Sequence, residues 1–199
     1  MDDLEVTRRE FLALSATGAA AAALPAEAEA APAAPPKVRG PGRVEIALRV
    51  NGARRRVEVE PSASLAEALR DGLALTGTKI GCDRGACSAC TVLLDGAPAS
   101  ACMTFALDVG EREVTTIEGL AHGGRLHPVQ EAFLAHDATQ CGFCTPGMVM
   151  SCAALLARRA HPTLDDVKQA VSGNLCRCGT YPKVFEAVLA AAGTRVSEK

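Results

Sequence analysis

Apolar and polar residues alternate along residues 44–50 and again along 57–59, and the pair Asn51-Gly52 lies between the two runs. Residues that recur at every second position share one face of a β-strand. An Asn-Gly pair favours the tight two-residue turn of a hairpin. The pattern therefore predicts a β-hairpin with one apolar face. That face is expected to consist of Val44, Ile46, Leu48, Val50, Val57 and Val59.

A short helix and a further strand are predicted after the hairpin. Ser64 and Glu67 have the spacing of a capping box, which marks the start of a helix. A loop of glycines and small residues at 81–90 leads into an apolar run at 91–94, and Asp95-Gly96 then provides a turn. This half of the ordered chain is expected to form a small sheet with one short helix.

The second half of the chain has the residue spacing of helices. Thr145-Pro146 marks the start of one helix, Thr163 and Asp166 cap another, and a last helix is predicted at about 182–192. Four short helices, beginning near His127, can bury one core. The fold class is therefore predicted to be α+β. The apolar helix faces are expected at Met148, Val149, Cys152, Leu155, Leu156, Val184, Val188 and Ala191.

The first thirty residues differ from the rest of the chain. Arg8-Arg9 precedes an alanine-dominated apolar run that ends at Leu24, and small-residue sites suited to cleavage follow. This run is too short for a membrane-spanning helix, which needs roughly twenty residues, so no stable membrane anchor is expected. Residues 1–30 resemble a twin-arginine signal peptide, which predicts export of the folded protein to the periplasm. The alternative is a disordered alanine-rich tail with an accidental Arg pair.

The charge balance argues against a nucleic-acid partner. The chain has 23 acidic and 21 basic residues, and removal of residues 1–30 takes away six acidic and two basic ones. The remaining 17 acidic and 19 basic residues give a near-neutral protein. It also has no Trp and a single Tyr, so it offers neither a basic surface nor a stacking platform. A Pro/Ala-rich linker is expected at residues 31–41.

Eight of the nine cysteines form two groups of four. The first group, Cys82, Cys87, Cys90 and Cys102, has the spacing C-x4-C-x2-C-x11-C, which is typical of plant-type ferredoxins. Four soft thiolates complete the coordination that the bridging sulfides of a 2Fe-2S cluster leave open. Small residues around them let backbone amides approach the sulfurs. Zinc is the alternative metal, although zinc ribbons usually pair two short C-x2-C knuckles.

The second group consists of Cys141, Cys144, Cys176 and Cys178. Its spacing is C-x2-C, a long gap and then C-x-C, and a C-x-C pair is unusual for zinc. This group is predicted to bind a second 2Fe-2S cluster. Disulfides are another possibility for an exported chain, but cluster ligation would remove these thiols from oxidation. Cys152 belongs to neither group and is expected to be a buried bystander.

Three stretches of the chain resemble the 2Fe-2S subunit of the xanthine oxidase family of molybdenum hydroxylases. They are residues 81–96 (GCDRGACSACTVLLDG), 140–148 (QCGFCTPGM) and 173–181 (GNLCRCGTY). With its exported leader, the whole chain looks most like the periplasmic aldehyde oxidoreductases. The resemblance implies a β-grasp, plant-type ferredoxin-like domain at 42–118 and a small all-α four-helix 2Fe-2S domain at 119–199.

The resemblance also implies a function and partners. A large partner subunit would hold a molybdenum-pterin cofactor, and a medium subunit would bind FAD. This chain would relay single electrons from molybdenum through its two 2Fe-2S clusters to FAD, during oxidation of aldehydes to carboxylic acids. Purines and N-heterocycles are alternative substrates. Gln140 and Cys178 match family positions that contact the pterin, although Gln140 could instead cap a helix. No catalytic residue is assigned to this chain.

Two other functions stay open at this point. A freestanding two-cluster ferredoxin-like electron carrier would need no partner, but the residues that match pterin-contacting positions argue against it. A zinc-stabilised module without redox activity would be colourless, whereas 2Fe-2S proteins are red-brown. The histidines show no ligand-like arrangement, so roles in turns and helix caps are expected for His122, His127, His136 and His161.

Overall fold

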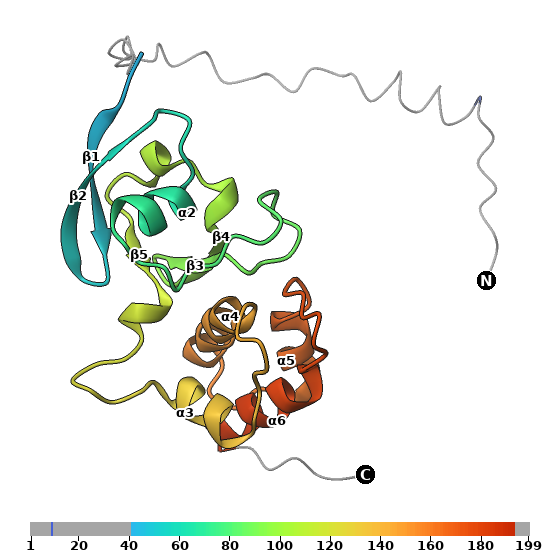
Figure 1. Ribbon diagram of the computed structural model, residues 1–199. Coiled ribbons are helices and arrows are strands. Elements are labelled where there is room, and N and C mark those ends of the chain that lie inside the picture. Colours follow the sequence, from blue (N-terminus) through green and yellow to red (C-terminus); the bar gives the residue numbers. More distant parts are fainter. Residues whose placement is uncertain (1–8, 10–40, 194–199) are drawn as a thin grey trace. The chain divides into compact units, whose positions relative to one another are not determined.

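The computed structural model describes residue 9 and residues 41–193. The proposed export signal, apart from Arg9, and residues 31–40 of the linker lie outside the described residues. Residues 41–193 fall within a single compact unit, in which a sheet-containing part is followed by a helical part (Figure 1). Across these described residues, no helix combines the length and the apolar character that a membrane crossing requires.

The predicted hairpin is confirmed. Strands β1 (Val44–Val50) and β2 (Ala53–Val59) pair antiparallel. Asn51 and Gly52 join them with φ angles of 52° and 75°. Both values lie in the left-handed region, as a two-residue hairpin turn of this kind requires. The expected apolar face is buried except for Val44, which is partly exposed.

The predicted capping box is also confirmed, at the start of a helix that is shorter than an ordinary α-helix. Helix α2 (Leu65–Glu67) begins where the Glu67 amide donates to the Ser64 hydroxyl and the Ser64 amide donates to the Glu67 carboxylate. A π-helical turn at Ala68–Gly72 follows directly. A Cβ at Gly72 would lie 2.2 Å from Cγ2 of Val57 on β2, so the absence of a side chain allows this turn to pack closely on the hairpin.

A five-stranded mixed sheet forms the centre of the first part of the chain. Its order is β2-β1-β5-β3-β4, in which β5 runs parallel to β1 and the other neighbours are antiparallel. The predicted Asp95-Gly96 turn is present and joins β3 to β4, a strand that the sequence did not predict. The combination of this sheet with the later helices confirms the α+β class. The remaining strands are β3 (Thr91–Leu94), β4 (Ala97–Ser100) and β5 (Glu113–Thr115), and 3-10 turns occupy Ala101–Met103, Ala106–Val109 and Ile117–Gly119.

Helices dominate the second part, and their predicted boundaries agree well with the structure. Thr145 begins α4, the Thr163–Asp166 capping box is present at α5, and α6 starts and ends one residue earlier than predicted. His127 caps α3, which confirms a cap role for that histidine. The helices are α3 (Pro128–Ala135), α4 (Thr145–Arg158), α5 (Leu164–Ala170) and α6 (Tyr181–Ala191).

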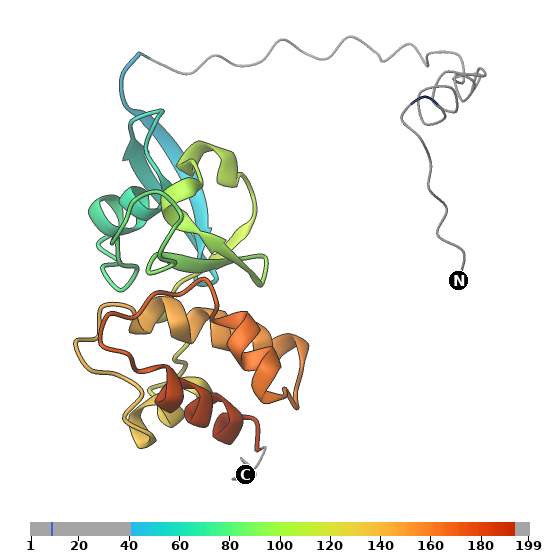
Figure 2. The same cartoon turned by 90° about the vertical axis from the view of Figure 1, so that its right-hand side faces the viewer.

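Strand β3 connects two hydrophobic cores. Its residues Val92 and Leu94 belong to the core of the sheet, whereas Leu93 belongs to the core of the helices. Alternate residues of a strand face opposite sides, so β3 is buried on both. Helix α4 packs on this strand, and both views show the helix lying beneath the sheet (Figures 1 and 2). Cys152 on α4 is fully buried, as expected.

Two cysteine sites beside one helix

The first cysteine group is assembled by a loop and a strand pair. Cys82, Cys87 and Cys90 lie on the loop that precedes β3, and Cys102 lies in the 3-10 turn that follows β4. Because β3 and β4 are antiparallel neighbours, the start of β3 lies beside the end of β4, and this brings Cys90 and Cys102 together. The Cys102 amide donates to the Cys90 sulfur at 3.5 Å. The distant fourth cysteine is thus placed by the hairpin.

The thiols of this group meet in pairs. Cys87 lies close enough to Cys82 to affect the pKa of that thiol, and Cys102 and Cys87 lie close enough to Cys90 to affect the pKa of Cys90. A 2Fe-2S cluster needs two thiolates at each of its irons, so two adjacent pairs fit this cofactor. Within the part of the chain that the structure describes, no group of three or more His, Cys, Asp or Glu side chains is arranged to bind a single metal ion.

The cysteine loop turns its backbone amides toward sulfur. The Ala86 amide donates to the Cys82 sulfur at 3.2 Å. The amide of Arg84, followed by the Cys87 thiol, lowers the pKa of Cys82 to about 7. On the inner side of the site, burial raises the pKa of Cys90 to about 11. The loop therefore favours thiolate at its exposed end, whereas a buried thiolate at Cys90 would need the positive charge of bound metal.

The second cysteine group is assembled by two segments that precede helices. Cys141 and Cys144 lie just before α4, and Cys144 is the N-cap residue of that helix. Cys176 and Cys178 lie between α5 and α6. The thiols again meet in two pairs, Cys144 with Cys176 and Cys141 with Cys178. The start of α4 contributes free amides and the positive end of a helix dipole, which favour negative charge at this site.

Burial and hydrogen bonds also shift the pKa values of thiols in the second group. Burial, followed by the Cys176 thiol, raises the pKa of Cys144 to about 12. Burial also acts to raise the pKa of Cys176, but hydrogen bonds led by the Thr180 hydroxyl outweigh it and lower that pKa to about 7. The Tyr181 hydroxyl accepts a 2.8 Å hydrogen bond from the Cys176 amide. Tyr181 thus helps to hold the cysteine segment in place.

Gln140 and Cys178 lie on the accessible side of the second group. Gln140 and Cys141 are exposed, and Cys178 is partly exposed. The N-cap residue of helix α4 is Cys144, four positions after Gln140, and the Cys144 side chain makes no capping bond. Thr139 and Thr145, on either side of this segment, join their hydroxyls at 2.8 Å. Gln140 is thus an exposed residue next to Cys141, whose thiol pairs with that of Cys178.

The two cysteine groups are neighbours, which the sequence did not indicate. The Leu175 amide donates a 3.0 Å hydrogen bond to the Cys87 carbonyl, so the second group's segment contacts the first group's loop directly. A Cβ at Gly81 would lie 3.2 Å from the Cys87 sulfur and 3.4 Å from Cε1 of Phe143. The ring of Phe143, a residue between Cys141 and Cys144 in the sequence, therefore packs against the first group's loop.

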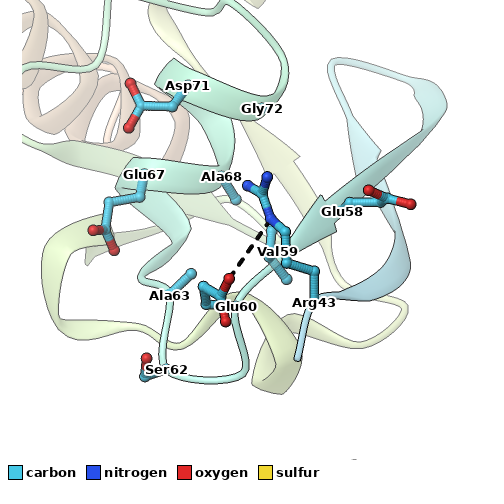
Figure 3. A pocket seen from close by; sticks show the side chains of 10 residues that line it. All are labelled: Arg43, Glu58, Val59, Glu60, Ser62, Ala63, Glu67, Ala68, Asp71 and Gly72. Atoms are coloured by element: carbon cyan, nitrogen blue, oxygen red, sulfur yellow. Dashed lines mark ion pairs between the residues drawn. The ribbon is translucent and has the colours of Figure 1, made fainter. Parts of the chain in front are cut away.

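An acidic groove on the sheet part is separate from these sites. Figure 3 shows the Arg43 and Glu60 side chains that line it pointing toward one another, and their ion pair measures 3.8 Å. Glu58, Glu67 and Asp71 supply further acidic side chains. Its ten labelled lining residues include no cysteine or histidine, so it contributes no ligand to either cysteine group.

Comparisons with known families agree with this arrangement. A family model described as a 2Fe-2S iron-sulfur cluster binding domain matches residues 48–116. A second model, described as a 2Fe-2S binding domain, matches residues 116–189. Each match contains one group of four cysteines. The 2Fe-2S cofactors inferred from the cysteine spacing are thereby confirmed.

Relatives cover most of the chain. The aldehyde oxidoreductase iron-sulfur-binding subunit PaoA of Escherichia coli O157:H7 is 40% identical over 206 residues, which cover 96% of this chain and 90% of the relative. The nicotine 6-hydroxylase small subunit of Paenarthrobacter nicotinovorans is 50% identical over 151 residues, with 76% and 91% coverage. The crystal structure of quinoline 2-oxidoreductase from Pseudomonas putida 86 matches with a TM-score of 0.73 at 43% identity, with 76% and 94% coverage. The chain therefore belongs to the family of 2Fe-2S iron-sulfur subunits of the xanthine oxidase-type molybdenum hydroxylases.

Proposed function

We propose that this chain relays single electrons from a molybdenum-pterin site in a large partner subunit to FAD in a medium partner subunit. Membership of the family makes it an electron-transfer subunit of a molybdenum hydroxylase. The observation that supports the two-cluster relay is the direct contact between the segments that carry the two sets of paired thiols: the Leu175 amide, next to Cys176, donates to the Cys87 carbonyl. A 2Fe-2S cluster, when bound, takes up and gives back one electron at a time, which suits a relay.

The proposed ligands follow from the thiol pairs. One cluster is held by a first set of thiols, which consists of Cys82, Cys87, Cys90 and Cys102. The other cluster is held by a second set of four thiols from the later cysteine group. The protein's own work at each site is to fix the thiols, direct amides toward sulfur and limit the access of water. The second set consists of Cys141, Cys144, Cys176 and Cys178.

The second set is proposed to face the molybdenum subunit. The exposure of Gln140 and Cys141, together with the partial exposure of Cys178, supports this orientation. The Gln140 amide can both donate and accept, which suits the heteroatom-rich edge of a pterin. We expect Gln140→Ala to slow reduction of this chain by the molybdenum site while both clusters stay intact. An unchanged rate of reduction would remove the pterin contact from the proposal.

Aldehydes are the proposed substrates of the complex. The PaoA relative, named for an aldehyde oxidoreductase, matches across 96% of this chain. The relatives named for nicotine and nicotinate match three quarters of it, so an N-heterocycle is the second candidate. Steady-state assays of the purified complex with benzaldehyde and with nicotinate separate the two. Turnover of nicotinate alone would replace aldehydes with N-heterocycles in the proposal.

Export by the twin-arginine route is proposed to place the protein in the periplasm. The support for this route is the sequence of the leader. Before export, residues 42–118 are proposed to fold as a β-grasp domain and residues 119–199 as a four-helix domain, each with its cluster bound. Replacing Arg8 and Arg9 together with Lys should retain the protein in the cytoplasmic fraction. Unchanged periplasmic accumulation of the double variant would exclude this route.

Metal analysis tests the central proposal. The chain, purified with the subunits that accompany it, should contain about four iron and four acid-labile sulfide per copy. Zinc without labile sulfide would overturn the proposal in favour of a structural module. Recovery of a red-brown chain without any molybdenum-containing partner would favour a freestanding carrier.

A matched pair of cysteine variants assigns the ligands. Cys102→Ser should lower the iron and sulfide content by about half, because it removes a ligand of one cluster of two. Cys152→Ala is the control, since Cys152 is fully buried but belongs to neither set. It should leave the iron content unchanged. Equal iron loss in both variants would contradict the ligand assignment.

A further inference from the structure

A buried asparagine joins the two cysteine segments. Asn174 is 3% exposed and lies two residues before Cys176. Its amide nitrogen donates a 3.0 Å hydrogen bond to the backbone oxygen of Ser88, the residue that follows Cys87. Its amide oxygen accepts a 2.9 Å hydrogen bond from the hydroxyl of Ser151 on α4. One side chain thereby connects both cysteine segments and the helix beside them.

The Ser88 carbonyl is held by several donors. Ser88 has a φ of 52°, a left-handed conformation that is unfavourable for a residue with a side chain and persists where surrounding contacts enforce it. Its carbonyl accepts hydrogen bonds from the Thr91 amide at 3.3 Å and from the Thr91 hydroxyl at 2.8 Å. Both of these donors belong to the first cysteine loop and its strand. Asn174 adds a donor from the other cysteine segment.

The two segments also pack at backbone distance. A Cβ at Gly147 would lie 2.3 Å from the Ser88 carbonyl oxygen, so α4 can approach this peptide only because residue 147 has no side chain. Asn174 and Leu175 hold successive carbonyls of the first loop, those of Ser88 and Cys87. The Leu175 hydrogen bond completes a path from one cysteine segment to the other through covalent bonds and a single hydrogen bond.

We propose that Asn174 is a positioning residue that sets the separation of the two clusters and thereby the rate of electron exchange between them. The inference rests on the ligand sets proposed above. Electron tunnelling falls exponentially with distance, and the dipolar interaction between two electron spins falls with the cube of distance. A displaced Ser88 carbonyl would move Cys87 relative to Cys176. Both quantities would then change although every ligand is retained.

The test compares two asparagine variants in the full chain, purified with its accompanying subunits. Asn174→Leu keeps a side chain of similar size and removes both side-chain hydrogen bonds. Asn51→Leu is the matched control, because the Asn51 side chain also makes two hydrogen bonds, both with Thr116 and outside the cysteine segments. Iron and labile sulfide are measured in each protein, with about four of each expected per chain.

The readout is the splitting that the two spins produce in the EPR spectrum of the fully reduced protein. We expect the splitting to narrow in Asn174→Leu and electron exchange after pulsed reduction to slow. Asn51→Leu should match the wild type in both. A wild-type splitting and exchange rate in an Asn174→Leu protein with full iron content would overturn the inference. Wild-type protein without iron would instead overturn the proposed function, so the two failures are distinguishable.

A second variant decides the question if Asn174→Leu binds less iron. Asn174→Asp keeps the shape of the side chain and its acceptor for Ser151. As a carboxylate it offers no donor to the Ser88 carbonyl. A narrowed splitting in this variant supports the inference, and an unchanged splitting overturns it.

Discussion

The Tyr181 hydroxyl is shared by two backbone groups of the second cysteine segment. It accepts from the Cys176 amide at 2.8 Å and donates to the Asn174 carbonyl at 2.9 Å. Tyr181→Phe leaves both groups without this partner, and an unsatisfied polar group that is partly or fully buried destabilises by roughly 1–3 kcal/mol. We expect the free energy of unfolding to fall by about that amount. The reduction potential of the second cluster should also shift, because the Cys176 amide becomes free to reorient toward sulfur.

Chemical denaturation and an EPR-monitored redox titration measure these two effects. Phe185→Leu is the control for the ring, since Phe185 packs against Tyr181 with ring centroids 6.4 Å apart. This variant should lower stability through lost packing and leave the potential unchanged. A Tyr181→Phe protein with wild-type stability and potential would show that the hydroxyl bonds are unimportant.

Sequence reasoning at the residue scale succeeded where partners are near in the chain. A capping box joins residues three positions apart, so Ser64–Glu67 could be predicted and is confirmed. Asn174 and Ser88 are 86 positions apart, and no local pattern connects them. Their contact exists only because α4 and the segment after α5 close over the first cysteine loop.

Helix α4 packs closely against the first cysteine loop at Gly147, and a substitution there tests whether this close packing positions the loop. In a free helix, Gly147→Ala would add about 1 kcal/mol of stability through helix propensity. Here the new Cβ would lie 2.3 Å from a backbone oxygen, which cannot rotate away. Overpacking of this kind destabilises by about 1–3 kcal/mol, so we expect a net loss of unfolding free energy in urea denaturation. The loss should be accompanied by a changed EPR splitting, because Ser88 must move.

Gly173→Ala provides the contrast. Its Cβ would lie 3.2 Å from the Ser88 hydroxyl oxygen, which belongs to a side chain that can rotate. We therefore expect a smaller change in stability than for Gly147→Ala. If the two variants lose equal stability, the clash with the backbone carbonyl is not the cause.

The elements that the sequence missed are those stabilised by their neighbours. Strands β4 and β5 have four and three residues, and such short runs show no clear alternation. Strand β5 forms because β1 and β3 pair with it from both sides. The start of α4 and both ends of α6 could be predicted within a residue, because these helices carry their own start and stop signals.

The whole molecule depends on β3, which lies between the two cores. An apolar run at 91–94 predicts a strand, but it cannot show that its two faces enter different cores. The structure assigns Val92 and Leu94 to the sheet and Leu93 to the helices. The relative position of the cysteine groups therefore depends on a contact that only the tertiary structure reveals.

Replacement of Leu93 should weaken the connection between the sheet and the helices. Leu93→Ala creates a cavity where β3 meets α4, and a buried Leu→Ala change destabilises by roughly 2–5 kcal/mol. Because the lost contacts join the two cores, we expect unfolding followed by far-UV circular dichroism and by the visible spectrum of the clusters to separate into two transitions. Leu48→Ala is the control, since Leu48 is 1% exposed and lies in the sheet core alone. It should destabilise by a similar amount while the two probes stay coincident. Coincident transitions in Leu93→Ala would mean that contacts other than β3, such as the Asn174 hydrogen bond, are sufficient to make the cores unfold as one.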